Sequence, residues 1–136
     1  MAMFECLILG DSIGVGTATA LVARHAIHCD VMAVERVRAG QILGWRKPAK
    51  RYRTSILAIG SNDRPGTRLV GDLVKIRASI TTRRAIWLLP YSREMAPLVN
   101  SVAVAFGDES IDLKRFATSD QIHPHRYDDV ARALLK

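Results

Sequence analysis

The sequence is poor in cysteine and contains no long apolar run. Its 136 residues include two cysteines, Cys6 and Cys29. Both lie in or beside apolar segments, so we interpret them as small core residues in a reducing compartment, not as a disulfide or a metal site. No apolar run is long enough to span a bilayer. The N-terminus carries Glu5 and has no basic residue before its apolar run, whereas a signal peptide begins with a positively charged segment. We therefore expect no transmembrane segment and a cytoplasmic location.

Other absences narrow the chemistry. No repeat, linker or low-complexity segment interrupts the chain, and no cluster of residues has the spacing of metal ligands, so we expect no metal or other cofactor. The segment Gly10 to Gly16 lacks the Lys followed by Ser or Thr of a phosphate-binding loop. Basic residues are not interleaved with aromatic ones, and no nucleic-acid recognition motif accompanies them. We therefore expect no nucleic-acid partner.

The composition is that of a globular protein. Hydrophobic residues make up 49% of the chain and charged residues 24%, and the length suits one domain spanning residues 1–136. The net charge is +7. Such a balance indicates either a polyanionic partner or only a well-solvated surface. We favour the solvated surface because the arginines are spread along the chain, with their densest cluster at 46–53, which we interpret as a surface connection.

Short apolar runs alternate with stretches of helical periodicity. The pattern predicts strands at 4–9, 30–34, 54–59, 84–89 and 110–113. It predicts helices at 15–27, 42–45, 69–80 and 95–106, and a last helix that opens at Pro124. Strands that alternate with helices in this way are typical of an α/β layer fold on a parallel sheet.

The turn Gly10-Asp11-Ser12 lies between the first strand and the first helix. There the backbone N–H of Ser12 is a free helix-terminal donor above the positive end of the helix dipole, a position that suits a nucleophile whose reaction develops a negative oxygen. We expect Asp11 to brace the turn. The alternative is an ordinary turn with a Ser or Asp cap.

A second candidate segment runs from Asp120 to Pro124. Asp120 and His123 are three residues apart, so Asp120 can hold the imidazole Nδ1 proton and leave Nε2 to take the proton of Ser12. The alternative is that Asp120 caps the last helix and His123 is incidental. Ligand sites of parallel sheets lie outside the carboxyl ends of the strands, and Gly40 and Asn62 also follow strands there.

In these residues the chain resembles the SGNH hydrolases, the GDSL-type esterase and lipase superfamily. The four sequence blocks of that family occur here in order as Gly10-Asp11-Ser12, Ala39-Gly40, Gly60-Ser61-Asn62-Asp63 and Asp120-Gln121-Ile122-His123-Pro124. The resemblance implies a flavodoxin-like, three-layer α/β/α sandwich with a central parallel sheet of about five strands. It also implies a triad of Ser12, His123 and Asp120, with an oxyanion hole formed by the N–H groups of Ser12 and Gly40 and the Asn62 amide. Ile13 departs from the family pattern, which has Leu at that position.

The function implied is that of a serine hydrolase that cleaves carboxylic esters through an acyl-enzyme on Ser12. The short segment between the fourth strand and Asp120 leaves little material for a lid, which favours small acyl groups such as acetyl, removed from an alcohol or a carbohydrate. Tyr91 and Arg93 either line the cleft or are plain surface. One alternative is an enzyme acting on anionic cell-wall or surface polysaccharide, suggested by the net charge alone. Another is a non-catalytic flavodoxin-like module that binds phosphate at a helix N-terminus. The sequence does not indicate the oligomeric state.

Overall fold

The structure is a computed structural model that describes residues 3–136, so residues 1 and 2 of the expected domain lie outside it. Its strands are β1 (Met3–Gly10), β2 (Asp30–Ala33), β3 (Arg51–Ala58), β4 (Thr81–Leu89) and β5 (Glu109–Asp112). Its helices are α1 (Ser12–His25), α2 (Ala39–Leu43), α3 (Thr67–Ala78), α4 (Met95–Phe106) and α5 (Tyr127–Leu134), with a 3₁₀ turn η1 (Leu113–Arg115).

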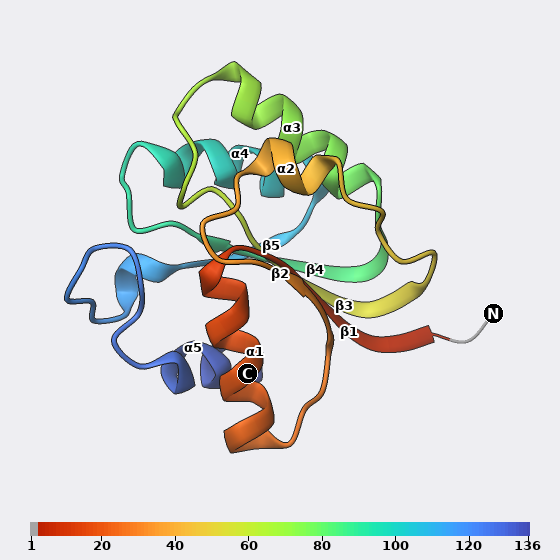
Figure 1. Cartoon of the computed structure of the whole chain (residues 1–136), viewed down its shortest axis with the longest axis vertical. Coiled ribbons are helices and arrows are strands. Elements are labelled where there is room, and N and C mark those ends of the chain that lie inside the picture. Colours follow the sequence, from red (N-terminus) through yellow and green to blue (C-terminus); the bar gives the residue numbers. More distant parts are fainter. Residues whose placement is uncertain (1–2) are drawn as a thin grey trace.

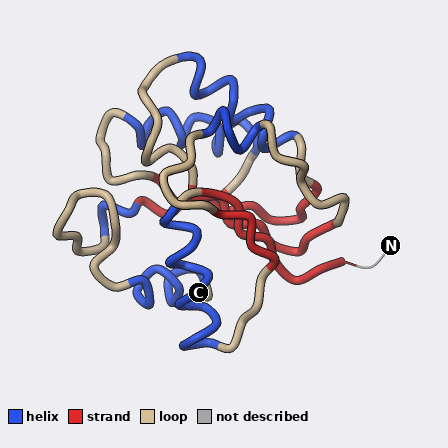
Figure 2. The backbone as a smooth tube through the Cα atoms, viewed as in Figure 1, coloured by secondary structure: helices blue, strands red, loops and turns tan. Residues whose placement is uncertain are grey.

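The five strands form one parallel sheet in the order β2-β1-β3-β4-β5. Helices α2, α3 and α4 cover one face of this sheet, and α1 and α5 cover the other (Figures 1 and 2). The chain is therefore a three-layer α/β/α sandwich, as the resemblance implied, and its strand order is the flavodoxin-like one. Because β1 lies between β2 and β3, the loops that follow these two strands flank the loop that follows β1.

Two apolar clusters hold the layers together. Side chains alternate along each strand, so Leu7 and Leu9 of β1 face α2, α3 and α4, whereas Ile8 faces α1 and α5. All three are fully buried, and each contributes roughly 1.5–3 kcal/mol relative to an exposed position. Burial on both faces explains why the first run is apolar throughout, as is typical of a central parallel strand.

Several element boundaries differ from the prediction by a few residues, and two of these differences change an interpretation. β3 begins at Arg51, so the end of the segment 46–53 belongs to the sheet and not to a surface connection; Tyr52 is buried between two exposed arginines. The last helix begins at Tyr127 and not at Pro124. The backbone N–H of His125 donates to the carbonyl of Ala117 at 2.7 Å, which holds this segment in a loop and delays the helix.

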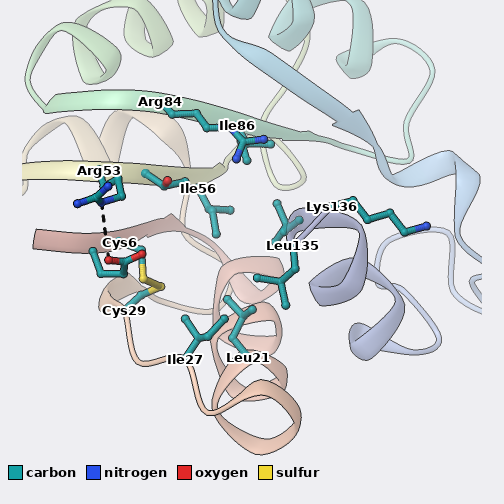
Figure 3. A pocket seen from close by; sticks show the side chains of 13 residues that line it. Cys6, Leu21, Ile27, Cys29, Arg53, Ile56, Arg84, Ile86, Leu135 and Lys136 are labelled. Carbon is teal, nitrogen blue, oxygen red and sulfur yellow. Dashed lines mark ion pairs between the residues drawn. A yellow bond between two sulfur atoms is a disulfide. The ribbon is translucent and has the colours of Figure 1, made fainter.

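The expectation that the cysteines are separate thiols is wrong, because Cys6 and Cys29 form a disulfide. Leu7 pairs with Asp30 in the sheet, so the residue before each of them comes within disulfide distance, with the two Cα atoms 4.8 Å apart. The bond lies beside a cavity of about 320 Å³ near the amino ends of the strands (Figure 3). Disulfides are rare in reducing compartments, so this bond weighs against the cytoplasmic location, which stays a prediction.

Candidate active site

The turn after β1 is fixed by a close backbone approach. Gly10 lies against β3 so closely that a Cβ on it would sit 2.1 Å from the carbonyl oxygen of Ala58. The next backbone N–H, that of Asp11, donates to the same oxygen at 2.9 Å. Only glycine fits here. The contact sets the direction in which the chain enters α1 and so the position of Ser12, the first residue of that helix.

Asp11 braces the turn from within. Its side chain is fully buried, and its Oδ1 caps α1 by accepting the backbone N–H of Ile13 at 2.9 Å. Burial raises the pKa of this carboxyl to about 6, against the lowering effect of the backbone N–H groups of Ile13 and Ser61. The expected bracing role of Asp11 is therefore supported by its position.

The structure brings Ser12, His123 and Asp120 into one hydrogen-bonded chain. The hydroxyl oxygen of Ser12 lies 2.8 Å from Nε2 of His123, although 111 positions separate them. On the other side of the ring, Nδ1 of His123 lies 2.7 Å from Oδ2 of Asp120. A carboxylate can only accept, so the proton belongs on Nδ1, and Nε2 is left to accept from Ser12. The side chain of His123 is 39% exposed, so the site is open to solvent.

Asp120 is held in its ionised form. The backbone N–H of His123 donates to its Oδ1 at 2.8 Å, and that of Ile122 donates to the same atom at 2.9 Å. These two bonds and the contact with the His123 ring lower the pKa of Asp120 below its usual value. One carboxylate thus fixes both the backbone and the ring of His123.

Thr118 is a residue that the sequence analysis missed. Its hydroxyl donates to the carbonyl oxygen of His123 at 2.6 Å and accepts the backbone N–H of Gln121 at 3.1 Å. Gln121 has a positive φ of 62°, and the two bonds close the loop around that residue. The available signal was a hydroxyl side chain two residues before Asp120, since Thr and Asp in such loops bond to nearby backbone groups.

Of the three expected oxyanion donors, Asn62 and Gly40 lie outside the hydrogen-bonded chain of Ser12, His123 and Asp120. The amide of Asn62 donates to the carbonyl oxygen of Val37 at 3.1 Å, which leaves its second N–H free to donate elsewhere. Gly40 lies inside α2 and not in the loop before it, because a bond from the backbone N–H of Arg38 to the Gln41 side chain starts the helix early. Within residues 3–136, no hydrogen bond joins Asn62 or Gly40 to Ser12 or His123.

Tyr91 and Arg93 are committed to structural contacts. Tyr91 is buried, and its hydroxyl donates to the carbonyl oxygen of Phe116. Arg93 forms a two-pronged ion pair with Asp112 and also donates to the carbonyls of Pro90 and Tyr91. They therefore hold the loop after β4 against the end of β5.

Two further properties concern the described part of the chain as a whole. No three His, Cys, Asp or Glu side chains among residues 3–136 gather in a way that would hold a metal ion. None of the helices in this range has the length and apolar character needed to cross a membrane.

Solved structures resemble the chain over nearly its whole length. Est24, a carbohydrate acetylesterase from Sinorhizobium meliloti, superposes with a TM-score of 0.67 over 97% of this chain and 98% of that chain, at 11% sequence identity. The aryl esterase of M. smegmatis gives a TM-score of 0.65 over 96% of both chains, also at 11% identity. The catalytic domain of the Streptococcus pneumoniae peptidoglycan O-acetyltransferase OatA gives 0.63 over 97% of this chain and 88% of that one, at 16% identity.

These three proteins are SGNH hydrolases. The chain has the SGNH hydrolase fold. No protein-family model matches the sequence, and no curated protein matches it either. The likeness to SGNH hydrolases is thus one of three-dimensional structure, and it agrees with the order of the four sequence blocks. In this SGNH-hydrolase fold, Ser12 and His123 lie at the carboxyl edge of the parallel sheet.

Proposed function

We propose that the protein is a serine hydrolase of carboxylic esters, with Ser12 as the nucleophile. The observation that carries the proposal is the continuous chain from the Ser12 hydroxyl through His123 to Asp120. A serine hydroxyl is a weak nucleophile unless an adjacent base removes its proton, and a third group that orients the base completes the arrangement. All three groups are present at hydrogen-bond distance before any substrate binds.

In the first half of the reaction, Oγ of Ser12 attacks the ester carbonyl carbon while Nε2 of His123 takes the hydroxyl proton. The carbonyl oxygen becomes an oxyanion. When the tetrahedral intermediate collapses, the imidazolium returns the proton to the leaving alcohol, and the acyl group stays on Ser12. Asp120 remains ionised throughout and stabilises the imidazolium.

In the second half, His123 removes a proton from water, and the resulting hydroxide attacks the acyl-enzyme. A second oxyanion forms and collapses, the acid leaves, and Ser12 regains its proton from the imidazolium. We assign the backbone N–H of Ser12, at the positive end of α1, as a donor to both oxyanions. We assign the free N–H of the Asn62 amide and the N–H of Gly40 as further donors, each contributing roughly 3 kcal/mol to barrier lowering.

A small acyl group, acetyl above all, suits this site best. Asp120 and His123 are both substantially exposed, so residues 3–136 leave the reacting atoms open and do not enclose a long acyl chain over them. The structural neighbours include a protein described as a carbohydrate acetylesterase and another described as a peptidoglycan O-acetyltransferase. These descriptions support an acetyl ester of an alcohol or carbohydrate as the substrate class.

Hydrolysis of p-nitrophenyl acetate and p-nitrophenyl butyrate tests the proposal, with wild type compared with Ser12→Ala between about pH 5 and pH 9. We expect activity only in the wild type, faster on acetate than on butyrate, and rising with pH as one imidazole loses its proton. Equal rates in the two proteins would remove Ser12 as the nucleophile. They would then favour the flavodoxin-like binding module, which tight binding of a flavin or nucleotide would support.

A further inference from the structure

A second hollow, separate from the hydrogen-bonded chain, lies beside the turn that carries Ser12. Its volume is about 670 Å³, and it is open to solvent. Its walls come from the first turn of α2, the loop after β3 and the first half of α3. The residues that give it chemical character are Arg38, Gly40, Asp63, Arg64, Arg68 and Asp72.

The sheet order places this hollow next to the reacting serine. It is built on the loops after β2 and β3, and β1, which ends at the Ser12 turn, lies between those two strands. The bond from the Asn62 amide to the carbonyl of Val37 ties the two loops together immediately before Asp63 and Arg38. Asp63 is also near enough to Asp11 that its charge contributes to raising the pKa of Asp11. A molecule in the hollow can therefore extend to Ser12.

Three arginines line this hollow, and the charge of one of them, Arg38, lowers the pKa of Asp63. Among residues 3–136, Arg38, Arg64 and Arg68 make no ion pair within 4.0 Å. Other arginines of the chain, such as Arg77 and Arg93, are each paired in two-pronged fashion with an aspartate. Three arginines without an ion pair thus line one hollow beside the proposed site, an arrangement that the even spread of arginine in the sequence does not indicate.

The two acidic groups of the hollow have different roles. Both oxygens of Asp63 accept the backbone N–H of Ala39, at 3.0 and 3.2 Å, so this carboxylate is committed to holding α2. Asp72 is partly exposed, and its Oδ2 lies 3.6 Å from where a Cβ on Gly40 would be. Because a free carboxylate accepts hydrogen bonds, Asp72 suits a hydroxyl-rich ligand. Guanidinium groups bind carboxylates through parallel N–H bonds.

We propose that this hollow binds the acidic sugar unit of an acylated, carboxylate-bearing carbohydrate, with Arg64 and Arg68 on the sugar carboxylate and Asp72 on its hydroxyls, while the ester reaches Ser12. The inference rests on the proposed function, which it deepens by naming the substrate class. Arg38, at the start of α2, adds to the positive potential that attracts such a substrate. A neutral acetylated sugar lacks the group that these cations recognise.

The test compares acetylated oligogalacturonate, which carries carboxylates, with neutral acetylated xylo-oligosaccharide and with p-nitrophenyl acetate. The variant is Arg64→Gln with Arg68→Gln. The matched control is Arg51→Gln with Arg83→Gln, which removes the same charge from exposed positions in the first halves of β3 and β4, far from Ser12. We expect the Arg64/Arg68 variant to lose about tenfold in kcat/KM on oligogalacturonate through KM, and the control variant to lose less than about twofold.

The other substrates and a binding measurement distinguish a failure of the subsite proposal from a failure of the proposed hydrolase function. Rates on xylo-oligosaccharide and p-nitrophenyl acetate should stay unchanged in both double variants, and the preference of the wild type for oligogalacturonate should shrink as salt rises. An equal loss on all substrates, or no loss on oligogalacturonate, overturns the subsite. If the wild type hydrolyses none of the three, the proposed function fails. Calorimetric binding of unacetylated oligogalacturonate to Ser12→Ala, weakened by the Arg64/Arg68 changes but not by the control, would still support the subsite, and absence of binding would refute it.

Discussion

The ring of Tyr127 lies so close to Gly16 that a β-carbon on that glycine would sit 2.3 Å from the Cζ atom of the ring. Gly16 is in α1 and Tyr127 is the first residue of α5, so this contact sets the distance between the two helices on one face of the sheet. α1 begins at Ser12, and the loop that carries His123 leads directly into α5. The contact therefore also helps to hold the nucleophile and its base at their observed separation.

We expect Gly16→Ala to lower the free energy of unfolding by about 1–3 kcal/mol, because the added methyl group forces the two helices apart. Urea denaturation measures the change. Gly71→Ala is the matched control: it is a glycine in α3 with nothing within 4 Å of an added Cβ, so alanine there should stabilise the protein by about 0.5–1 kcal/mol. Two variants of equal stability would refute the close contact.

The hydrogen bonds of Thr118 in the loop around His123 predict that this residue positions the base and does not itself react. Thr118→Val keeps the shape of the side chain but removes the hydroxyl bonded to His123 and Gln121. We expect kcat for p-nitrophenyl acetate to fall about tenfold, with KM little changed, because a small displacement of the base weakens proton transfer. Thr118→Ser, which retains the hydroxyl, should restore most of the rate. A loss of equal size in Thr118→Ser would mean that the hydroxyl is not what matters.

The contact between Asp120 and His123 predicts the tautomer of the base. Asp120→Asn replaces an acceptor with an amide that can donate to Nδ1, so Nε2 would carry the proton and could no longer accept from Ser12. We expect kcat to fall by roughly 10³–10⁴ while the fold is kept. Since hydrogen bonds lower the pKa of Asp120, its own titration should not shape the wild-type profile at neutral pH. Stopped-flow hydrolysis with circular dichroism separates the loss of rate from a loss of structure.

Buried Asp11 predicts how stability varies with pH. Its pKa is raised from 3.8 to about 6, so the folded state holds a proton that the unfolded chain has already lost. The stability linked to this group is present below about pH 4 and is lost as the pH rises through about 6, on the order of 3 kcal/mol in total. Asp11→Asn keeps an N-cap acceptor and should remove this pH dependence. The difference in urea midpoints between the two proteins should therefore change between about pH 4 and pH 6 and level off above that range; a constant difference throughout would contradict the prediction.

The sequence predicted the strands and most helices because burial leaves a direct signature in the residues. The run that became β1 is apolar on both faces, and the segment that became α4 was predicted with its observed bounds; Gly107, in a left-handed conformation, ends that helix. The meeting of Ser12 with His123 was also foreseeable, since both follow elements whose ends lie at one edge of a parallel sheet. Local spacing alone placed Asp120 next to His123.

What the sequence did not reveal depends on register and on loop hydrogen bonds. The disulfide requires the pairing of Leu7 with Asp30, and nothing in an apolar run states which residues of two parallel strands lie side by side. The early start of α2, which places Gly40 inside a helix, depends on one bond from a backbone N–H to the Gln41 side chain. The sequence likewise does not indicate that Arg38 lies near Arg64 and Arg68, because that proximity follows from the order of the strands.

The bond between Cys6 and Cys29 closes a sequence separation of 23 residues that contains all of α1. Replacing both cysteines with serine should lower the free energy of unfolding by about 3 kcal/mol, because the unfolded chain regains the freedom that the bond removes. A reducing agent should lower the urea midpoint of the wild type by a similar amount and leave the double variant unchanged. The esterase rate of the folded double variant should stay within about twofold of the wild type, since Cys6 lies in the first half of β1 and Ser12 follows its far end. A rate lost together with the bond, while circular dichroism shows the fold intact, would instead mean that the disulfide controls the position of α1 and, through it, the nucleophile.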